Sequence, residues 1–331
     1  MGTYLGETDE ATDRAYTEAI LAAVAAGINV LDTAINYRHQ LSERCVGAAL
    51  RQLVESGQAR RDELVVCTKA GYLSLDAAVK AEPREYFLQE YVKPGVVKME
   101  EVAGGMHCMA PRYLNDQIER SRRNLGLETI DVFYLHNPET QLAYVPGQEF
   151  QQRLWAAFTV LEDAVESGRI RYYGTATWSG YRATPEQPEH LELEAVLEVA
   201  RDAGGEHHHF RFLQLPFNLV MPEAFAYANQ RVDGDTVPLL EAARRLGVAV
   251  VGSATLLQGQ LIRDLPPAIA QTLGLGSGAG NSIQFARSAP GLMTALVGMS
   301  RAQHVAENLA VARQPLTSRE EWDSLWGENE E

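Results

Sequence analysis

Eight short runs rich in β-branched residues alternate with longer amphipathic stretches along the 331-residue chain. This alternation is typical of repeated βα units built on a parallel sheet. The expected strands are residues 2–5, 28–31, 64–67, 131–135, 171–175, 211–215, 248–251 and 294–297. The expected helices are residues 13–26, 42–55, 112–125, 151–167, 191–203, 238–246, 282–288 and 302–312.

Eight such units without a break in composition favour one closed barrel over two domains. Several expected helices end in a glycine directly before the next strand, as a helix C-cap and a short loop require: Gly27, Gly126, Gly168 and Gly247. An open doubly wound sheet is the alternative, but it should carry a G-x-G-x-x-G turn, and no strand-to-helix turn of this sequence has one. We therefore predict an α/β protein with a single (β/α)8 barrel over residues 1–331.

Two connections are too long for a simple βα repeat. Residues 70–111 form a long insertion between a strand and its helix, and residues 216–237 form a shorter one. Long loops that follow barrel strands emerge at the C-terminal face, where the active site lies. We expect them to wall the substrate pocket, with Tyr72, Tyr86 and Tyr91 facing it.

The C-terminal segment, residues 313–331, contains Trp322, Leu325 and Trp326 at helical spacing. Apolar residues at this spacing form one face of a helix. We expect this segment to dock on the barrel, and a contact with the substrate is a second option.

Charge and composition restrict the classes of partner. The net charge of −15 repels phosphate backbones and anionic membranes. No run approaches the roughly 20 apolar residues of a membrane span, and the acidic start has no apolar signal region. We expect a cytoplasmic protein that binds neither nucleic acid nor membrane; a homo-oligomer is compatible with the sequence. Cys45, Cys67 and Cys108 lack the spacing of a zinc or disulfide framework, and no metal site is predicted.

Polar side chains stand at the ends of successive expected strands: Asp32, Lys69 and His136, with Tyr37 on the loop after the first of them. Each has an ordinary structural explanation when it is taken alone. If they converge, the Lys69 ammonium should lower the pKa of the Tyr37 phenol from about 10, while Asp32 holds the lysine charged. Such a phenol can exchange a proton with a carbonyl or alcohol oxygen, and His136 could orient that oxygen.

A motif around these residues carries a family resemblance. The pattern G-x-x-x-x-D-T-A-x-x-Y, followed by Ser-Glu and a glycine, is matched by Gly27, Asp32, Thr33, Ala34, Tyr37, Ser42, Glu43 and Gly47. With Lys69 and His136 in order, the chain resembles an aldo-keto reductase over nearly its whole length, in the branch of the potassium-channel β-subunits and aldose dehydrogenases. The resemblance implies reversible hydride transfer between a nicotinamide cofactor and a carbonyl or alcohol. It makes Tyr37 the general acid or base, Lys69 and Asp32 its tuning pair, and His136 the orienting group.

The resemblance also implies a cofactor site. "FLQLPFNLV" places the amide-contacting role on Gln214, beside Thr177, and "LVGMSRAQHVAENLA" resembles the segment that binds the adenosine phosphate. The implied cofactor-binding residues are Thr3, Asp32, Thr177, Gln214, Ser253, Gly298, Ser300, Arg301, His304, Glu307 and Asn308. NADP(H) is favoured by family habit, and NAD(H) is the rival.

Two positions depart from the family pattern. Ala176 replaces a serine that normally contacts the carboxamide, and Ser253 stands where an aromatic ring usually stacks on the nicotinamide. Trp178 or a residue of the long insertion is then expected to orient the cofactor.

Two hypotheses of function follow. The first is an NAD(P)(H)-dependent oxidoreductase acting on a carbonyl or alcohol, with a sugar as one option because of the polar, tyrosine-containing insertion. The second is a regulatory protein that keeps the cofactor as a redox-sensing ligand with little turnover. Metal-dependent hydrolysis on the same barrel would need further ligands at strand ends, which the sequence does not supply in an obvious way.

Overall fold

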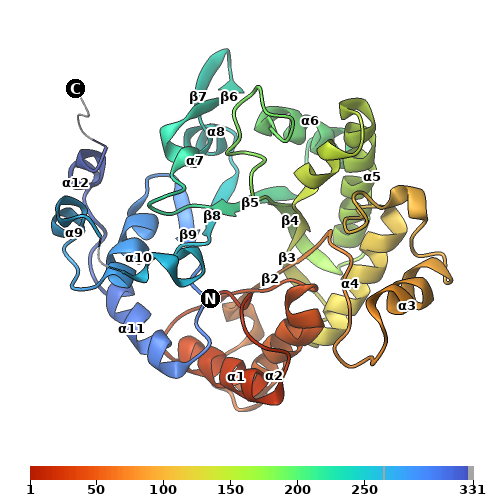
Figure 1. Cartoon of the computed structure of the whole chain (residues 1–331), viewed down its shortest axis with the longest axis horizontal. Helices are drawn as coiled ribbons and strands as arrows, with labels where there is room; N and C mark the ends of the chain where they lie inside the picture. The colour runs from red at the N-terminus through yellow and green to blue at the C-terminus, as the bar shows by residue number, and fades with distance from the viewer. Residues whose placement is uncertain (264, 327–331) are drawn as a thin grey trace.

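A computed structural model describes residues 1–263 and 265–326. Seven strands form one parallel sheet in the order β1-β2-β3-β4-β5-β8-β9. Their bounds are Val30–Asp32, Val65–Ala70, Ile130–His136, Ile170–Ala176, Phe210–Pro216, Ala249–Ser253 and Leu292–Ala295. The strands form an inner ring surrounded by helices (Figure 1), which confirms the predicted barrel class.

The ring is joined between its first and last strands by Gly2. Gly2 forms parallel bridges to Asp32 on one side and to Gly298 on the other, and its N–H donates to the Val297 carbonyl at 2.9 Å. The expected first strand, residues 2–5, is therefore reduced to one bridging residue. The chain leaves the sheet directly afterwards, since Tyr4 and Leu5 are both half exposed.

Eight principal helices lie outside the strands (Figure 1): α1 Glu10–Ala25, α2 Leu41–Glu55, α4 Pro111–Leu125, α5 Gly147–Glu166, α6 Leu193–Gly204, α8 Leu239–Arg245, α10 Gly278–Ser288 and α11 Ala302–Ala312. Short 3₁₀ turns and one further helix connect them: η1 Tyr37–Gln40, η2 Arg61–Glu63, η5 Pro138–Ala143, η6 Leu257–Ile262 and α9 Pro267–Leu273. In the part of the chain that the structure describes, none of the helices combines the length and apolarity needed to cross a bilayer.

The motif glycine Gly47 sets how closely two of these helices pack. A Cβ at this position of α2 would lie 2.4 Å from the carbonyl oxygen of Asn124, near the end of α4. Only glycine allows this approach without a shift of the backbone.

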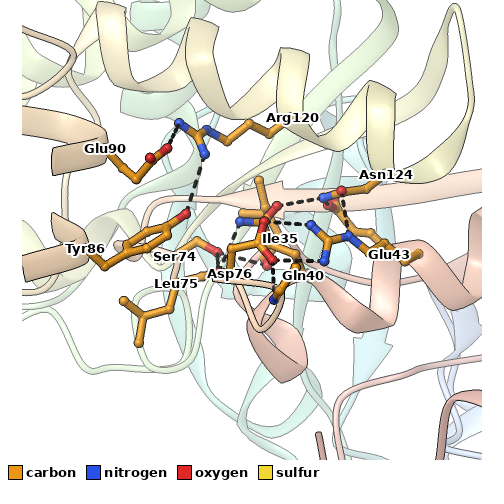
Figure 2. A network of polar contacts seen from close by, with 12 residues as sticks. Ile35, Gln40, Glu43, Ser74, Leu75, Asp76, Tyr86, Glu90, Arg120 and Asn124 are labelled. Atoms are coloured by element: carbon orange, nitrogen blue, oxygen red, sulfur yellow. Dashed lines mark hydrogen bonds and ion pairs between the residues drawn. The ribbon is translucent and has the colours of Figure 1, made fainter. Parts of the chain in front are cut away.

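The long insertion forms a small core of its own. It contains α3 Pro83–Phe87, the π-helical turn η3 Leu88–Val92 and η4 Met99–Glu101. Tyr86 and Tyr91 are buried there with Val97, Cys108 and Tyr113, so the prediction that they face the pocket is wrong. Aromatic rings bury large apolar areas, and Tyr86 and Tyr91 bury theirs by packing against α4. Figure 2 shows Arg120 of α4 contacting Glu90 and the Tyr86 hydroxyl.

The second excursion is a short helix, α7 Glu223–Ala226, followed by an antiparallel hairpin. Its strands are β6 Ala228–Val232 and β7 Asp235–Pro238, joined by Asp233 and Gly234. An Asp-Gly pair is a favoured two-residue hairpin turn because both residues tolerate positive φ.

The C-terminal helix α12, Arg319–Ser324, docks on the barrel as predicted. Trp322 is fully buried, stacks on Phe285 at 5.4 Å between ring centroids and meets the Phe225 ring edge-on at 4.4 Å. Its indole N–H donates to the Phe285 carbonyl at 3.0 Å. Residues 327–331 of the expected C-terminal segment lie outside the described residues.

We predict that Trp322→Ala lowers the free energy of unfolding by about 3–5 kcal/mol, because it removes a fully buried aromatic side chain. Urea denaturation measures the change. Trp155→Ala is the control, since Trp155 is 48% exposed, and it should cost less than about 1 kcal/mol. Equal losses in the two variants would contradict the docking of α12.

Candidate active site

A buried ion pair lies at the C-terminal end of strands β1 and β2. Lys69 Nζ lies 2.5 Å from Asp32 Oδ1 and donates to the Thr33 carbonyl oxygen at 2.7 Å. The second carboxylate oxygen, Asp32 Oδ2, accepts from Gln214 Nε2 at 2.7 Å. Both charges are almost completely shielded from solvent, with side-chain exposures of 1% for Lys69 and 5% for Asp32.

Tyr37 lies directly above this pair. The Lys69 ammonium is 5.0 Å from the centroid of the Tyr37 ring. The edges of two further rings meet Tyr37, Tyr4 at 4.9 Å and His136 at 5.9 Å between centroids. The structure thus brings all four predicted catalytic residues together.

The direction of the Tyr37 pKa differs from the expectation. Burial raises the pKa of the Tyr37 phenol above its ordinary value, and the opposing effect of the Lys69 ammonium is smaller. Burial also lowers the pKa of Lys69, but Asp32 and its other neighbours together raise that pKa above its ordinary value. At neutral pH, therefore, the lysine is charged and the phenol carries its proton.

His136 is held neutral. Burial, followed by the Lys69 charge and by His107, lowers the pKa of His136 well below its ordinary value. Its backbone carbonyl accepts from His107 Nε2 at 2.7 Å, while Gln141 Nε2 donates to His107 Nδ1 at 2.9 Å. These two contacts fix the His107 tautomer with its proton on Nε2.

The approach of His107 to the end of β3 requires a glycine. A Cβ on Gly71 would lie 2.4 Å from the His136 carbonyl oxygen and 2.8 Å from His107 Nε2. The long insertion thereby reaches the backbone of the candidate catalytic histidine.

A cavity of about 780 Å³ opens above Tyr37 and His136 and extends to the start of α11. Nearly all the residues that the sequence proposed line it: Thr3, Asp32, Tyr37, His136, Thr177, Gln214, Ser253, Gly298, Ser300, His304, Glu307 and Asn308. Lys69 lies beneath the floor, in contact with Asp32. Arg301 does not line the cavity and is exposed at the residue before α11.

Sequence reasoning missed several lining residues. Tyr4, Asn36 and Asn137 line the cavity beside Tyr37 and His136. Asn36 and Asn137 follow the ends of β1 and β3 within a few residues, and Tyr4 follows the bridging Gly2; these places in the sequence do not say which side chain turns inward. Tyr72 and Trp178, both named as candidates, do line it.

The buried carboxylate of Glu139 shapes the cavity wall. Its Oε1 accepts from the backbone N–H groups of Trp178 at 2.7 Å and Ser179 at 3.1 Å. Burial raises the pKa of Glu139, and the backbone N–H groups oppose that increase. Glu139 therefore holds the loop after β4, which carries Thr177 and Trp178 into the cavity.

The lining fits a nicotinamide cofactor in its polar donor set. The Thr177 hydroxyl is buried without a hydrogen-bond partner among the described residues, which leaves it for a carboxamide. Asp32 accepts one of the two N–H groups of Gln214 Nε2, so the second N–H and the amide oxygen are left. Ala176 and Ser253 supply no aromatic ring that could stack on the nicotinamide. Among the lining residues with large side chains, Trp178 is the sequence neighbour of Thr177.

A family model confirms the resemblance. The model of the aldo/keto reductase family matches residues 1–326. The chain belongs to the aldo/keto reductase family.

Among curated relatives, the D-threo-aldose 1-dehydrogenase of a Pseudomonas species is 30% identical over 153 residues, 46% of this chain and 41% of the relative. The L-glyceraldehyde 3-phosphate reductase of Escherichia coli is 26% identical over 237 residues, 71% of this chain and 51% of the relative. The match thus spans about half of these relatives or less.

Solved reductase structures share the fold at low identity. An aldo/keto reductase from Klebsiella pneumoniae in complex with NADP and acetate is 21% identical, with a TM-score of 0.63 over all of this chain and 92% of that one. The glycerol dehydrogenase of Gluconobacter oxydans is 19% identical, with a TM-score of 0.65 over 98% and 89%.

The buried histidines predict acid sensitivity of the fold. Burial lowers the pKa of His107 from 6.5 to about 4, so the unfolded chain takes up a proton there before the folded chain does. The stability that this neutral imidazole contributes is complete above pH 6.5 and is lost as the pH falls towards 4. We predict that His107→Gln reduces the slope of unfolding free energy against pH between 6.5 and 4.5 by about 1.4 kcal/mol per pH unit, one proton.

Urea unfolding at a series of pH values measures this slope. The exposed His207 provides the control, because His207→Gln should leave the slope unchanged. A wild-type slope in His107→Gln would show that the pKa of His107 is the same in the folded and unfolded chains.

Proposed function

We propose that this protein is an NADP(H)-dependent oxidoreductase that transfers hydride between the nicotinamide and a carbonyl or alcohol substrate. The observation that carries the proposal is the buried Lys69–Asp32 pair beneath Tyr37, at the floor of a cavity that reaches α11. Membership of the aldo/keto reductase family supports the reaction class.

The proposed role of Tyr37 is proton transfer. In reduction, the Tyr37 hydroxyl donates its proton to the carbonyl oxygen while negative charge develops there. Because burial raises the pKa of Tyr37, the phenol is protonated and ready to donate at neutral pH. The Lys69 ammonium, kept charged by Asp32, stabilises the phenolate that remains.

His136 and Asn137 are proposed to orient the substrate. A neutral imidazole carries one N–H, which can hydrogen-bond the same carbonyl oxygen without competing for the proton. Asn137 Nδ2 donates to the Tyr72 hydroxyl at 3.0 Å, so the two lining side chains support each other.

The cofactor, when bound, supplies the hydride. We propose that Thr177 and the Gln214 oxygen contact the carboxamide, with Thr3, Ser253 and Trp178 on the surrounding wall. The other end would lie at α11, whose first turn is capped by no side chain among the described residues and so offers free N–H groups to a phosphate. Ser300, His304, Glu307 and Asn308 line that end.

For the substrate, we propose an aldehyde, ketone or sugar. Rings of Tyr4, Tyr72 and Trp178 surround the reaction end, and Asn36 and Asn137 lie among them. Aromatic faces with interspersed amides suit a hydroxyl-rich carbon skeleton. The named activity of the Pseudomonas relative, an aldose dehydrogenase, is compatible with a sugar.

The test of the proposal is Tyr37→Phe. We predict that it lowers the turnover of a carbonyl panel of aldehydes, ketones and sugars by about 10²–10⁴-fold, because it removes one oxygen and its proton. Binding of NADPH, followed by fluorescence titration, should be unchanged. Tyr227→Phe is the control, since Tyr227 is half exposed and does not line the cavity, and it should keep wild-type turnover.

Two results would contradict the proposal. If neither NADPH nor NADH binds the wild type, the cofactor assignment fails. If nucleotide binds tightly and no carbonyl is turned over, the redox-sensing alternative, which the departures at Ala176 and Ser253 favour, replaces the enzyme.

Coenzyme preference is proposed to depend on Arg301. This exposed guanidinium beside the first turn of α11 can pair with a 2′-phosphate, which only NADP(H) carries. We predict that Arg301→Ala weakens NADPH binding about tenfold and leaves NADH binding unchanged. Arg313→Ala, at the other end of α11, is the control. An equal loss for both nucleotides, or none, would remove Arg301 from the site.

A further inference from the structure

The turn that carries Tyr37 has an unusual backbone. Arg38, His39 and Gln40 follow Tyr37 directly, and all three have positive φ, at 49°, 53° and 74°. Residues other than glycine adopt this left-handed region at a cost in free energy, and three in succession are rare. Such a turn persists only when surrounding contacts hold it, and strain of this kind gathers at functional sites.

The first set of contacts is made by the Arg38 side chain, which is 1% exposed. Its Nη2 donates to Asp13 Oδ1 at 2.6 Å, its Nε donates to the Glu7 carbonyl at 2.8 Å, and its Nη1 lies 3.6 Å from Cys45 Sγ. The guanidinium carbon lies 5.4 Å from the centroid of the Tyr16 ring. One side chain thus attaches the turn to helices α1 and α2 and to the N-terminal segment.

The second set comes from the long insertion and from α4. Gln40 Nε2 donates to the Leu75 carbonyl at 3.1 Å, and Gln40 Oε1 accepts from Asn124 at 3.0 Å (Figure 2). The Ala77 N–H donates to the His39 carbonyl at 3.1 Å. The insertion and α4 therefore hold the turn through Gln40 and His39, independently of the Arg38 side chain.

We infer that Arg38 is a positioning residue for Tyr37: its ion pair with Asp13 and its bond to the Glu7 carbonyl hold the left-handed turn that places the phenol above Lys69. Arg38 is adjacent to Tyr37 in the chain but does not line the cavity, so we place it outside the cofactor and substrate site. The kinetic part of the inference rests on the function proposed above.

Two substitutions separate anchoring from backbone strain. Asp13→Asn removes the ion pair and leaves the Arg38 backbone as it is. Arg38→Gly removes the anchor and also relieves the strain, because glycine adopts positive φ readily. We expect both to lower kcat by about tenfold to hundredfold, since a small displacement of a reacting group has an effect of this size. NADPH binding should change by less than about twofold.

Asp131→Asn is the matched control. Asp131 is also the carboxylate partner of a partly buried arginine, Arg61, at 2.6 Å, but it lies near the opposite ends of the strands. It should lower the melting temperature without lowering kcat.

A second measurement does not depend on turnover. In protein labelled with ¹³C at tyrosine Cζ, the Tyr37 signal is the one missing from the spectrum of Tyr37→Phe. We expect it to move in Asp13→Asn and Arg38→Gly and to stay in place in Asp131→Asn.

If Arg38→Gly keeps both kcat and the Tyr37 signal of the wild type, the turn forms without its anchor and the inference fails. If the wild type shows no turnover, the proposed enzyme activity fails, and the Tyr37 signal alone decides the role of Arg38.

Discussion

The buried ion pair between Lys69 and Asp32 is the constraint on which the site depends. Two opposite charges buried away from solvent are stable only when their remaining hydrogen-bonding groups also have partners. Here the Thr33 carbonyl accepts from Lys69, and the Gln214 amide donates to Asp32. Thr33 directly follows β1, whereas Gln214 belongs to β5, which is not a neighbour of β1 or β2 in the sheet, so the full set of partners is present only when the sheet has curled into a barrel. The same pair then determines what Tyr37 can do, because the ammonium stabilises the phenolate that burial disfavours.

The long insertion contributes to the site differently from a lid. Its aromatic residues make a separate core with α4, and only Tyr72 reaches the cavity. Its polar contacts instead hold the two chemically important segments: His107 binds the His136 carbonyl, and Ser74 donates to the Ile35 carbonyl at 3.0 Å (Figure 2). The insertion therefore acts as a rigid support for Tyr37 and His136.

Much of this arrangement could be predicted from the sequence, for identifiable reasons. The barrel follows from strand and helix periodicity, and the positions of Asp32, Lys69 and His136 follow because the ends of parallel strands meet at one face. The bounds of the strands follow less closely: the sequence predicts that β2 ends at residue 67, and in the structure it continues through Lys69 to Ala70. The side-chain roles of Thr177, Gln214 and the α11 residues remain predictions, although most of them line one cavity.

Other features have no local signal. The burial of Tyr86 and Tyr91 depends on packing against α4, which lies outside their own segment. The direction of the Tyr37 pKa depends on the balance of burial against one charge, and adjacency in sequence reports only the charge. The left-handed turn at Arg38 is formed by residues without that propensity, so the long-range contacts of Arg38 and Gln40 decide it.

Single-turnover transfer of deuterium from [4-²H]NADPH to a carbonyl substrate, with wild type beside Lys69→Met, tests whether the Lys69–Asp32 pair activates Tyr37. We predict deuterium on the former carbonyl carbon in the wild type. Transfer should be at least a hundredfold slower in Lys69→Met with nucleotide binding retained, because the uncharged side chain cannot stabilise the Tyr37 phenolate. Equal rates in the two proteins would contradict the role of the Lys69–Asp32 pair.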